Sequence, residues 1–213
     1  MTTLINKKHD VFVRLPMAGM ILFVVFYIIA ALQYPGGSYT FPNKMGFNLK
    51  DNYLCDLLDT QTINGLQNTA RTYARMALAI LCFSLMLLWV YLPKLFTVKN
   101  KRQIIMSVAG ILSMLITLFL ASEVHDIIIR IAGIFGALAL ILAIFELYKD
   151  RYNMLFSLGI ICLILFLTNY YIYETELLLY TLPLIQKITF IFCISWFILL
   201  NRALYKKLHC KHS

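Results

Sequence analysis

Residues 15–32, with the sequence LPMAGMILFVVFYIIAAL, form a run of apolar side chains that contains no charge. A helix needs about 20 such residues to cross the hydrocarbon core of a membrane. Five further apolar runs of similar length follow, at residues 76–92, 104–120, 127–145, 154–168 and 182–200. We therefore predict an all-α integral membrane protein, with a single domain over residues 1–213 that contains six transmembrane helices.

The amino-acid composition excludes a soluble globular domain. Hydrophobic residues make up 61% of the chain and charged residues only 14%, whereas soluble domains contain about 25% charged residues. The formal net charge of +9 lies in short clusters beside the apolar runs. Membrane topology and attraction to anionic lipid account for such clusters. We therefore predict membrane lipid as a partner and no nucleic-acid partner.

Positive charge is distributed unequally between the loops. Thirteen of the 19 Lys and Arg residues lie in the N-terminal lead, the second and fourth loops and the C-terminal tail. Short loops that are rich in Lys and Arg stay in the cytoplasm. The sequence thus predicts a multi-pass protein of the plasma membrane, which is the inner membrane in a bacterium, with both termini cytoplasmic.

The first loop, residues 33–75, is much longer than the others and is predicted to be external and folded. Leucines share one helical face over residues 52–59, which predicts a short amphipathic helix that Asn52 caps. Farther along, polar residues at intervals of four, three and four predict one helical face that leads into the second transmembrane helix. They are Asn64, Asn68, Arg71 and Arg75. Because guanidinium groups bind phosphate and carboxylate well, this stripe is either an exposed helix end or a site for an anionic headgroup.

The third loop brings charged residues to the same predicted boundary of the membrane. His125, Asp126 and Arg130 lie at the start of the fourth predicted helix. Arg130 is expected to pair with Asp126 or Glu123, because an unpaired charge inside the bilayer costs a few kcal/mol. These residues form either a helix-end ion pair or, together with Asp56 and the polar stripe, one outward-facing cavity.

The sequence predicts neither a metal site nor a cofactor. Catalytic zinc sites commonly use two or three histidines, and His125 is the only histidine on the predicted outer face. The chain contains no glycine-rich phosphate loop, nucleophile elbow or haem-binding sequence. The centres of the predicted helices carry almost no charge, which disfavours an ion-coupled transporter.

Three short motifs of the first loop carry a resemblance to a known family. They are Tyr34-Pro35-Gly36-Gly37, then Asn52-Tyr53-Leu54-Cys55-Asp56-Leu57, then Asn64-Gly65 followed by Asn68 and Arg71. The chain resembles a six-helix membrane family of bacteria and archaea, of undefined function, in which Asn-aromatic-Leu-Ser-Asp-Leu-Gly precedes an Asn-Gly…Asn element. Its layout is also similar to that of the eukaryotic Frag-type proteins, which act in GPI-anchor lipid remodelling. The resemblance implies the six-helix architecture and a joint role for the polar residues of these motifs, although Cys55 and Leu58 stand where the family has Ser and Gly.

Three functional hypotheses follow from these patterns. The first is a protein that recognises a lipid or an anionic headgroup in a polar cavity at its outer face. Its candidate residues are Asp56, Asn64, Asn68, Arg71, Arg75, His125, Asp126 and Arg130. The second is a lipid-modifying membrane enzyme in which Asp56, His125 and Asp126 are the acid–base groups. The third is a facilitator, or a structural partner of another membrane protein.

Overall fold

The computed structural model describes residues 2–121 and 124–210, and it confirms an all-α fold. Six long helices follow one another along the chain: α1 (Thr2–Gln33), α2 (Arg71–Tyr91), α3 (Lys101–Thr117), α4 (His125–Lys149), α5 (Asn153–Thr175) and α6 (Leu182–Cys210). Three short 3-10 helices lie between them: η1 (Cys55–Leu58), η2 (Leu92–Leu95) and η3 (Leu179–Thr181). Within the described ranges no strand forms, and extended backbone pairs only at two isolated bridges.

Five helical stretches are long enough and apolar enough to cross a membrane. They are Val13–Gln33, Arg71–Leu95, His125–Lys149, Asn153–Thr175 and Leu179–His209. The remaining long helix, α3, contains 17 residues, which span about 25 Å at 1.5 Å per residue, less than the roughly 30 Å of hydrocarbon. The structure therefore supports five of the six predicted transmembrane helices, and the crossing by α3 remains a prediction.

Most of the helices extend beyond the apolar runs that predict them. α2 begins at Arg71 rather than at residue 76, α5 continues to Thr175, and α6 continues to Cys210. Hydropathy marks the point at which a helix leaves the hydrocarbon, whereas the backbone keeps its helical hydrogen bonds in the polar boundary region. The ends of elements are for this reason the least predictable part of a fold.

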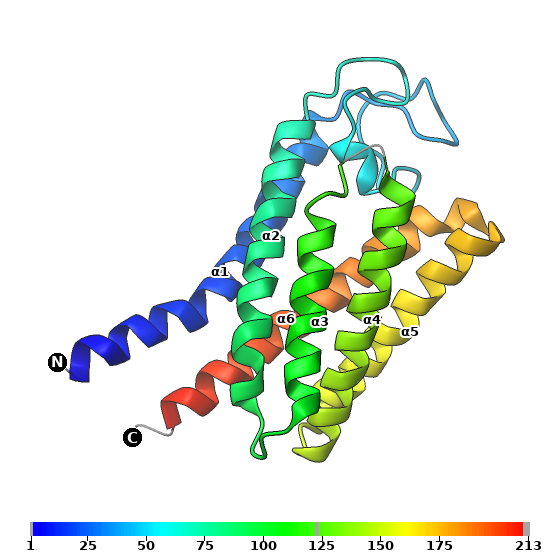
Figure 1. Ribbon diagram of the computed structural model, residues 1–213. Coiled ribbons are helices and arrows are strands. Elements are labelled where there is room, and N and C mark those ends of the chain that lie inside the picture. Colours follow the sequence, from blue (N-terminus) through cyan, green and yellow to red (C-terminus); the bar gives the residue numbers. More distant parts are fainter. Residues whose placement is uncertain (1, 122–123, 211–213) are drawn as a thin grey trace.

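The six long helices form a closed ring. Each helix packs against the next one along the chain, and α6 packs against α1 (Figure 1). Asn201 takes part in this closure, because its Nδ2 donates to the carbonyl of Val13 at 2.9 Å although the residue is only 1% exposed. Side-chain amides that bond across helices hold membrane bundles together.

The end of the bundle at η2, which we call the base, is densely packed. Leucines of α2, η2, α4 and α6 are fully buried there: Leu88, Leu92, Leu95, Leu147, Leu200 and Leu204. The α2–α3 contact is also close, since a Cβ added at Gly110 would lie 2.3 Å from Cδ2 of Trp89. These buried side chains are therefore packed closely against one another, as in other protein cores.

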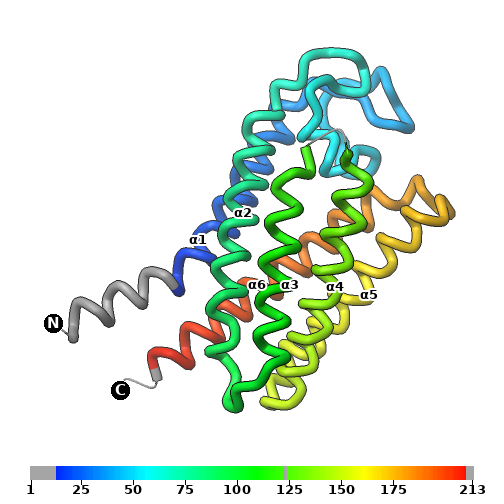
Figure 2. Tube along the Cα trace, in the orientation of Figure 1, coloured from blue at the N-terminus to red at the C-terminus, as the bar shows by residue number. Residues whose placement is uncertain are grey.

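Residues 34–70, which we call the cap, cross the opposite end of the bundle (Figure 2). The N–H of Gly37 donates to the carbonyl of Lys44 at 2.7 Å, and the N–H of Gly46 donates to the carbonyl of Pro35 at 3.0 Å. Gly37 has a φ of 86°, in the region that L residues rarely adopt, so a glycine suits this tight turn.

The cap contains one helical turn where the sequence predicts a longer amphipathic helix. In place of a helix over residues 52–59 the structure forms only η1, and no side chain caps it. The side chain of Asn52 bonds elsewhere in the cap, so this part of the prediction is wrong. Leu57 and Leu58 of η1 are buried, as the amphipathic pattern predicts.

Candidate functional site

The cap is attached to the bundle through the main chain of Leu54. Its N–H donates to Oε1 of Gln186 on α6 at 2.9 Å, and its carbonyl accepts from the hydroxyl of Tyr27 on α1 at 2.7 Å. Both bonds come from helices that are far from Leu54 in the sequence. The position of η1 over the bundle is therefore fixed from two sides.

A buried polar centre also joins the cap to α6. Asn52 is 1% exposed, and its Nδ2 donates to the carbonyl of Gly37 at 2.6 Å and to Oδ2 of Asp56 at 2.9 Å. The ammonium group of Lys187 donates to the carbonyls of Asn52 and Pro183. Buried polar groups need such partners, because an unpaired one costs several kcal/mol.

Asp56 is engaged in the interior of the cap. Its Oδ2 accepts from the N–H of Tyr53 at 2.9 Å as well as from Asn52. Burial raises the pKa of Asp56, although the hydrogen bonds from Asn52 and Tyr53 and the charge of Lys187 act to lower it. These contacts support a role in holding the cap together rather than in binding a ligand.

Asn64 and Asn68 lie outside α2, so the predicted four-residue helical stripe does not form. Nδ2 of Asn68 donates to the carbonyls of Asp56 at 3.1 Å and Asp59 at 2.9 Å, while its Oδ1 accepts from the N–H of Ala70 at 3.0 Å. An Asn that bonds the backbone two residues on makes a turn in place of a helix. Oδ1 of Asn64 accepts bonds from residues of its own turn.

Arg75 ties the cap to two further parts of the bundle. Its Nε donates to the carbonyl of Leu58 at 3.1 Å, and its Nη2 donates to the carbonyl of Ala121 at 3.3 Å. Burial raises the pKa of Asp59, whereas the nearby charges of His125 and Arg75 act to lower it. Asp59, a residue of the cap, thus lies near the start of α4 and near Arg75. Arg71, the first residue of α2, is half-buried.

The charged residues of α4 pair with α5. The hydroxyl of Tyr173 donates to Oδ1 of Asp126 at 2.6 Å. Arg130 binds both carboxylate oxygens of Glu174, at 2.8 and 3.3 Å. The predicted partner of Arg130 was Asp126 or Glu123; the first is replaced by Glu174, and the second lies outside the described residues.

The predicted site residues therefore fall into two hydrogen-bonded groups. Asp56, Asn68 and Arg75 belong to the cap, whereas Asp126 and Arg130 belong to the α4–α5 contact. His125 lies between them, with its Nδ1 3.4 Å from Oδ1 of Asp126. Asp56 and Asp126 each use their carboxylates elsewhere, so no contact supports them as an acid–base pair.

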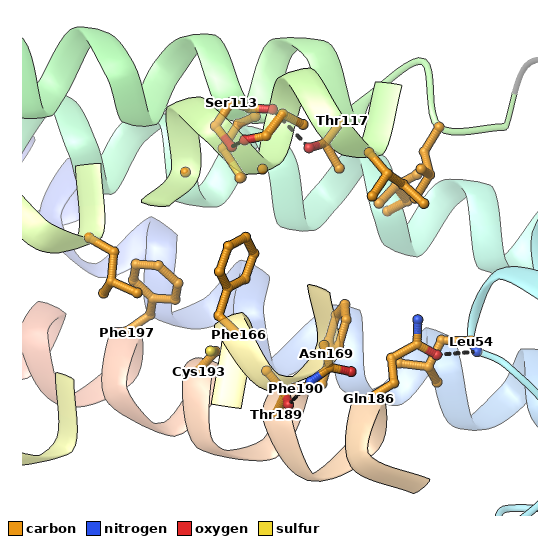
Figure 3. Close-up of a pocket in the computed structure, with 18 of the residues that line it drawn as sticks. Leu54, Ser113, Thr117, Phe166, Asn169, Gln186, Thr189, Phe190, Cys193 and Phe197 are labelled. Carbon is orange, nitrogen blue, oxygen red and sulfur yellow. Dashed lines mark hydrogen bonds between the residues drawn. The ribbon is translucent and has the colours of Figure 1, made fainter. Parts of the chain in front are cut away.

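A cavity of about 360 Å³ lies inside the ring, beside the cap. Small residues of α3 and α4 form one wall: Gly110, Ser113, Ala132, Gly133 and Gly136. Aromatic residues of α1, α5 and α6 form the other: Phe23, Phe166, Phe190, Trp196 and Phe197. Figure 3 shows Ser113 and Thr117 facing Phe166, Phe190 and Phe197 across this space. Leu54, Cys55 and Leu58 of the cap line one end of it.

The polar groups of the cavity wall are bonded mainly to the backbone. The hydroxyl of Ser113 donates to the carbonyl of Ala132 and that of Thr117 to the carbonyl of Ser113, both at 2.8 Å. Nδ2 of Asn169 donates to the carbonyl of Leu165 at 2.8 Å and to Oγ1 of Thr189. Because these donors are already used, the cavity presents a mostly apolar surface.

The cavity differs from the polar site that the sequence predicts. In the described part of the chain, none of the eight predicted residues lines it. Nor does any group of three or more His, Cys, Asp or Glu side chains within residues 2–121 and 124–210 have the arrangement of a metal site. Sequence reasoning missed Gln186 and Lys187, although they are the only adjacent polar pair in the apolar run at 182–200.

No protein-family model matches this chain, and no curated protein or solved structure shows significant similarity to it. The resemblance to the six-helix prokaryotic family therefore stays a prediction. Any functional conclusion rests on the cavity, the cap and the charges described above.

Proposed function

We propose that this protein crosses the membrane six times and binds the apolar part of a membrane lipid in the cavity beside the cap. The lining of the cavity carries the proposal. Aromatic side chains on one wall and small residues on the other give a narrow apolar space, and ligand sites are typically apolar clefts of about 300–1,000 Å³. The dense base and the anchored cap support a binding space that is bounded at both ends.

The place of α3 supports the sixth crossing. α3 packs against α2 and α4 within the ring, and it contributes Gly110 and Ser113 to the cavity wall. The residues that follow it, Leu118 to Ala121, are apolar and lengthen its path. Six crossings, with both termini cytoplasmic as the charge distribution predicts, place the cap on the outer side of the plasma membrane.

Tryptophan fluorescence tests lipid binding directly. The chain contains two tryptophans, Trp89 and Trp196, and both line the cavity while being only 3% and 1% exposed. Lipids with bromine on the acyl chain quench an indole only near contact. We expect such lipids to quench the emission of the purified, reconstituted protein, because the chain reaches the indoles through the cavity.

Gly133→Leu is expected to abolish this quenching by filling the cavity. A Cβ at Gly133 meets only Cζ of Phe166, at 3.5 Å, and Gly133 lines the cavity, so the added side chain can extend into it. Ile134→Phe is the matched control, since it adds apolar volume on a side chain that is 69% exposed. Equal quenching in both variants, or none in the wild type, would contradict the proposal.

A further inference from the structure

An open groove of about 390 Å³ lies at the base, between the first turn of α5 and the last turns of α6. Its lining consists of Tyr152, Asn153, Met154, Leu155, Leu199, Arg202, Ala203 and Lys206. We call it the α5–α6 groove. It is separate from the cavity beside the cap and shares with it no residue.

Two cations of this groove are unpaired. Arg202 and Lys206 are four residues apart on α6, so both lie on one helical face, and both are exposed. Neither forms a hydrogen bond or an ion pair with any residue in the ranges 2–121 and 124–210. Among the residues that the structure describes, no acidic side chain lines the groove. Two like charges at this spacing repel each other, so an anion between them is favoured.

Three other cations near the base have partners. Arg102 pairs with Glu146, with its Nε 3.2 Å from Oε1. Lys207 donates to the carbonyl of Leu95, and Arg14 donates to the hydroxyl of Tyr205. The lack of a partner at Arg202 and Lys206 is therefore not a general property of basic residues at this end of the bundle.

The rest of the groove is suited to hydrocarbon. Leu155 is buried, Leu199 is half-buried, and Met154 is 61% exposed. Apolar side chains add no binding energy for a soluble anion. A phospholipid, in contrast, has acyl chains beside its phosphate, and these chains can pack against such side chains. Basic pockets between transmembrane helices bind the headgroups of anionic lipids.

We propose that the α5–α6 groove binds an anionic phospholipid, with Arg202 and Lys206 at its phosphate and Met154 and Leu199 against its chains. This site is independent of the cavity beside the cap. It selects lipid by headgroup charge, whereas the cavity accepts an apolar chain.

The test compares two double variants that remove the same charge. Arg202→Gln/Lys206→Gln removes both groove cations. Lys101→Gln/Lys149→Gln removes two exposed cations of α3 and α4 that do not line the groove. Titration of the purified full chain in detergent with phosphatidylglycerol and with phosphatidylcholine, followed by native mass spectrometry, gives the apparent affinity for each lipid.

Wild-type protein and the Lys101/Lys149 variant are expected to prefer phosphatidylglycerol. The Arg202/Lys206 variant is expected to bind it about 30-fold more weakly, at roughly 1 kcal/mol per basic residue, while its binding of phosphatidylcholine and its quenching by brominated phosphatidylcholine stay unchanged. The charge-conserving variant Arg202→Lys/Lys206→Arg is expected to retain the preference. Equal loss in both double variants, no preference in the wild type, or equal competition by inorganic phosphate would overturn the proposal.

Discussion

Asn68 makes three hydrogen bonds with one buried amide, to Asp56, Asp59 and Ala70. Asn68→Ala leaves two carbonyls and an N–H without their partner, and an unsatisfied buried group costs about 1–3 kcal/mol. We expect the melting temperature of the purified protein to fall by several degrees. The measurement is thermal unfolding in detergent.

Asn64→Ala is the control for this change. Asn64 is less buried and bonds only within its own turn, so we expect a smaller decrease in melting temperature. If the two variants melt at the same temperature, the network around Asn68 does not stabilise the cap.

Asp56 gives the fold a dependence on pH. Because burial raises its pKa, the folded state favours the protonated carboxyl more than the unfolded chain does. The resulting stabilisation is fully present below the unfolded value of about 3.9 and is lost as the pH rises through the higher folded pKa. We expect the melting temperature to fall as the pH rises above the unfolded value, and to fall less in Asp56→Asn. An unchanged slope in this variant would contradict the pKa shift of Asp56.

Residue spacing identified some polar residues of the cap but not their hydrogen-bond partners. Asn68 does donate to the main-chain carbonyl of Asp56. The structure nevertheless turns them inward, since their partners are cap carbonyls and N–H groups that no helical periodicity identifies. The contact of Lys187 with the cap was not predicted, because its partner is the carbonyl of Asn52, which is 135 residues away in the sequence.

The helices offer a pair of glycines with opposite expected effects. A Cβ at Gly110 would lie 2.3 Å from the indole of Trp89, so Gly110→Ala must displace that indole or the helix that carries it, at a cost of about 1–3 kcal/mol. The methyl group of Gly133→Ala makes only an ordinary van der Waals contact. Because glycine destabilises the interior of a helix relative to alanine, this substitution is expected to stabilise the fold by about 0.5–1 kcal/mol. We expect a lower melting temperature for Gly110→Ala and a higher one for Gly133→Ala. Shifts of the same sign would refute the close α2–α3 contact.

Hydropathy located five spanning helices because each apolar run is long and nearly continuous. Hydropathy located α3 less well. The helix ends at Thr117, although the apolar run that predicts it continues to residue 120. Short loops predict that successive helices pack together, but the contact of α6 with α1 could not be predicted, because an apolar run does not indicate which distant helix it contacts. The cavity was missed for the same reason: it depends on glycines of α3 and α4 facing aromatics of α5 and α6.

The orientation of the whole molecule is testable with new cysteines. Thr40 is exposed in the cap, and Lys101 is exposed at the start of α3. We expect a membrane-impermeant maleimide to label Thr40→Cys in intact cells and Lys101→Cys only after permeabilisation, because positive loops stay inside. Cys55 is half-buried, and burial raises the pKa of its thiol to about 12, which slows its labelling because the thiolate is the reactive form. The reverse labelling pattern would invert the proposed topology.

The bond between Asn201 and Val13 has a consequence for biosynthesis. A ring that α6 closes upon α1 stays open while the ribosome is still producing the helices between them. During that interval Asn201 has not yet been made, and the carbonyl of Val13 lacks its donor. Contacts of such long sequence separation form late. A nascent chain therefore forms an open arc of helices, and the cavity gains its last wall only when α6 packs against α1.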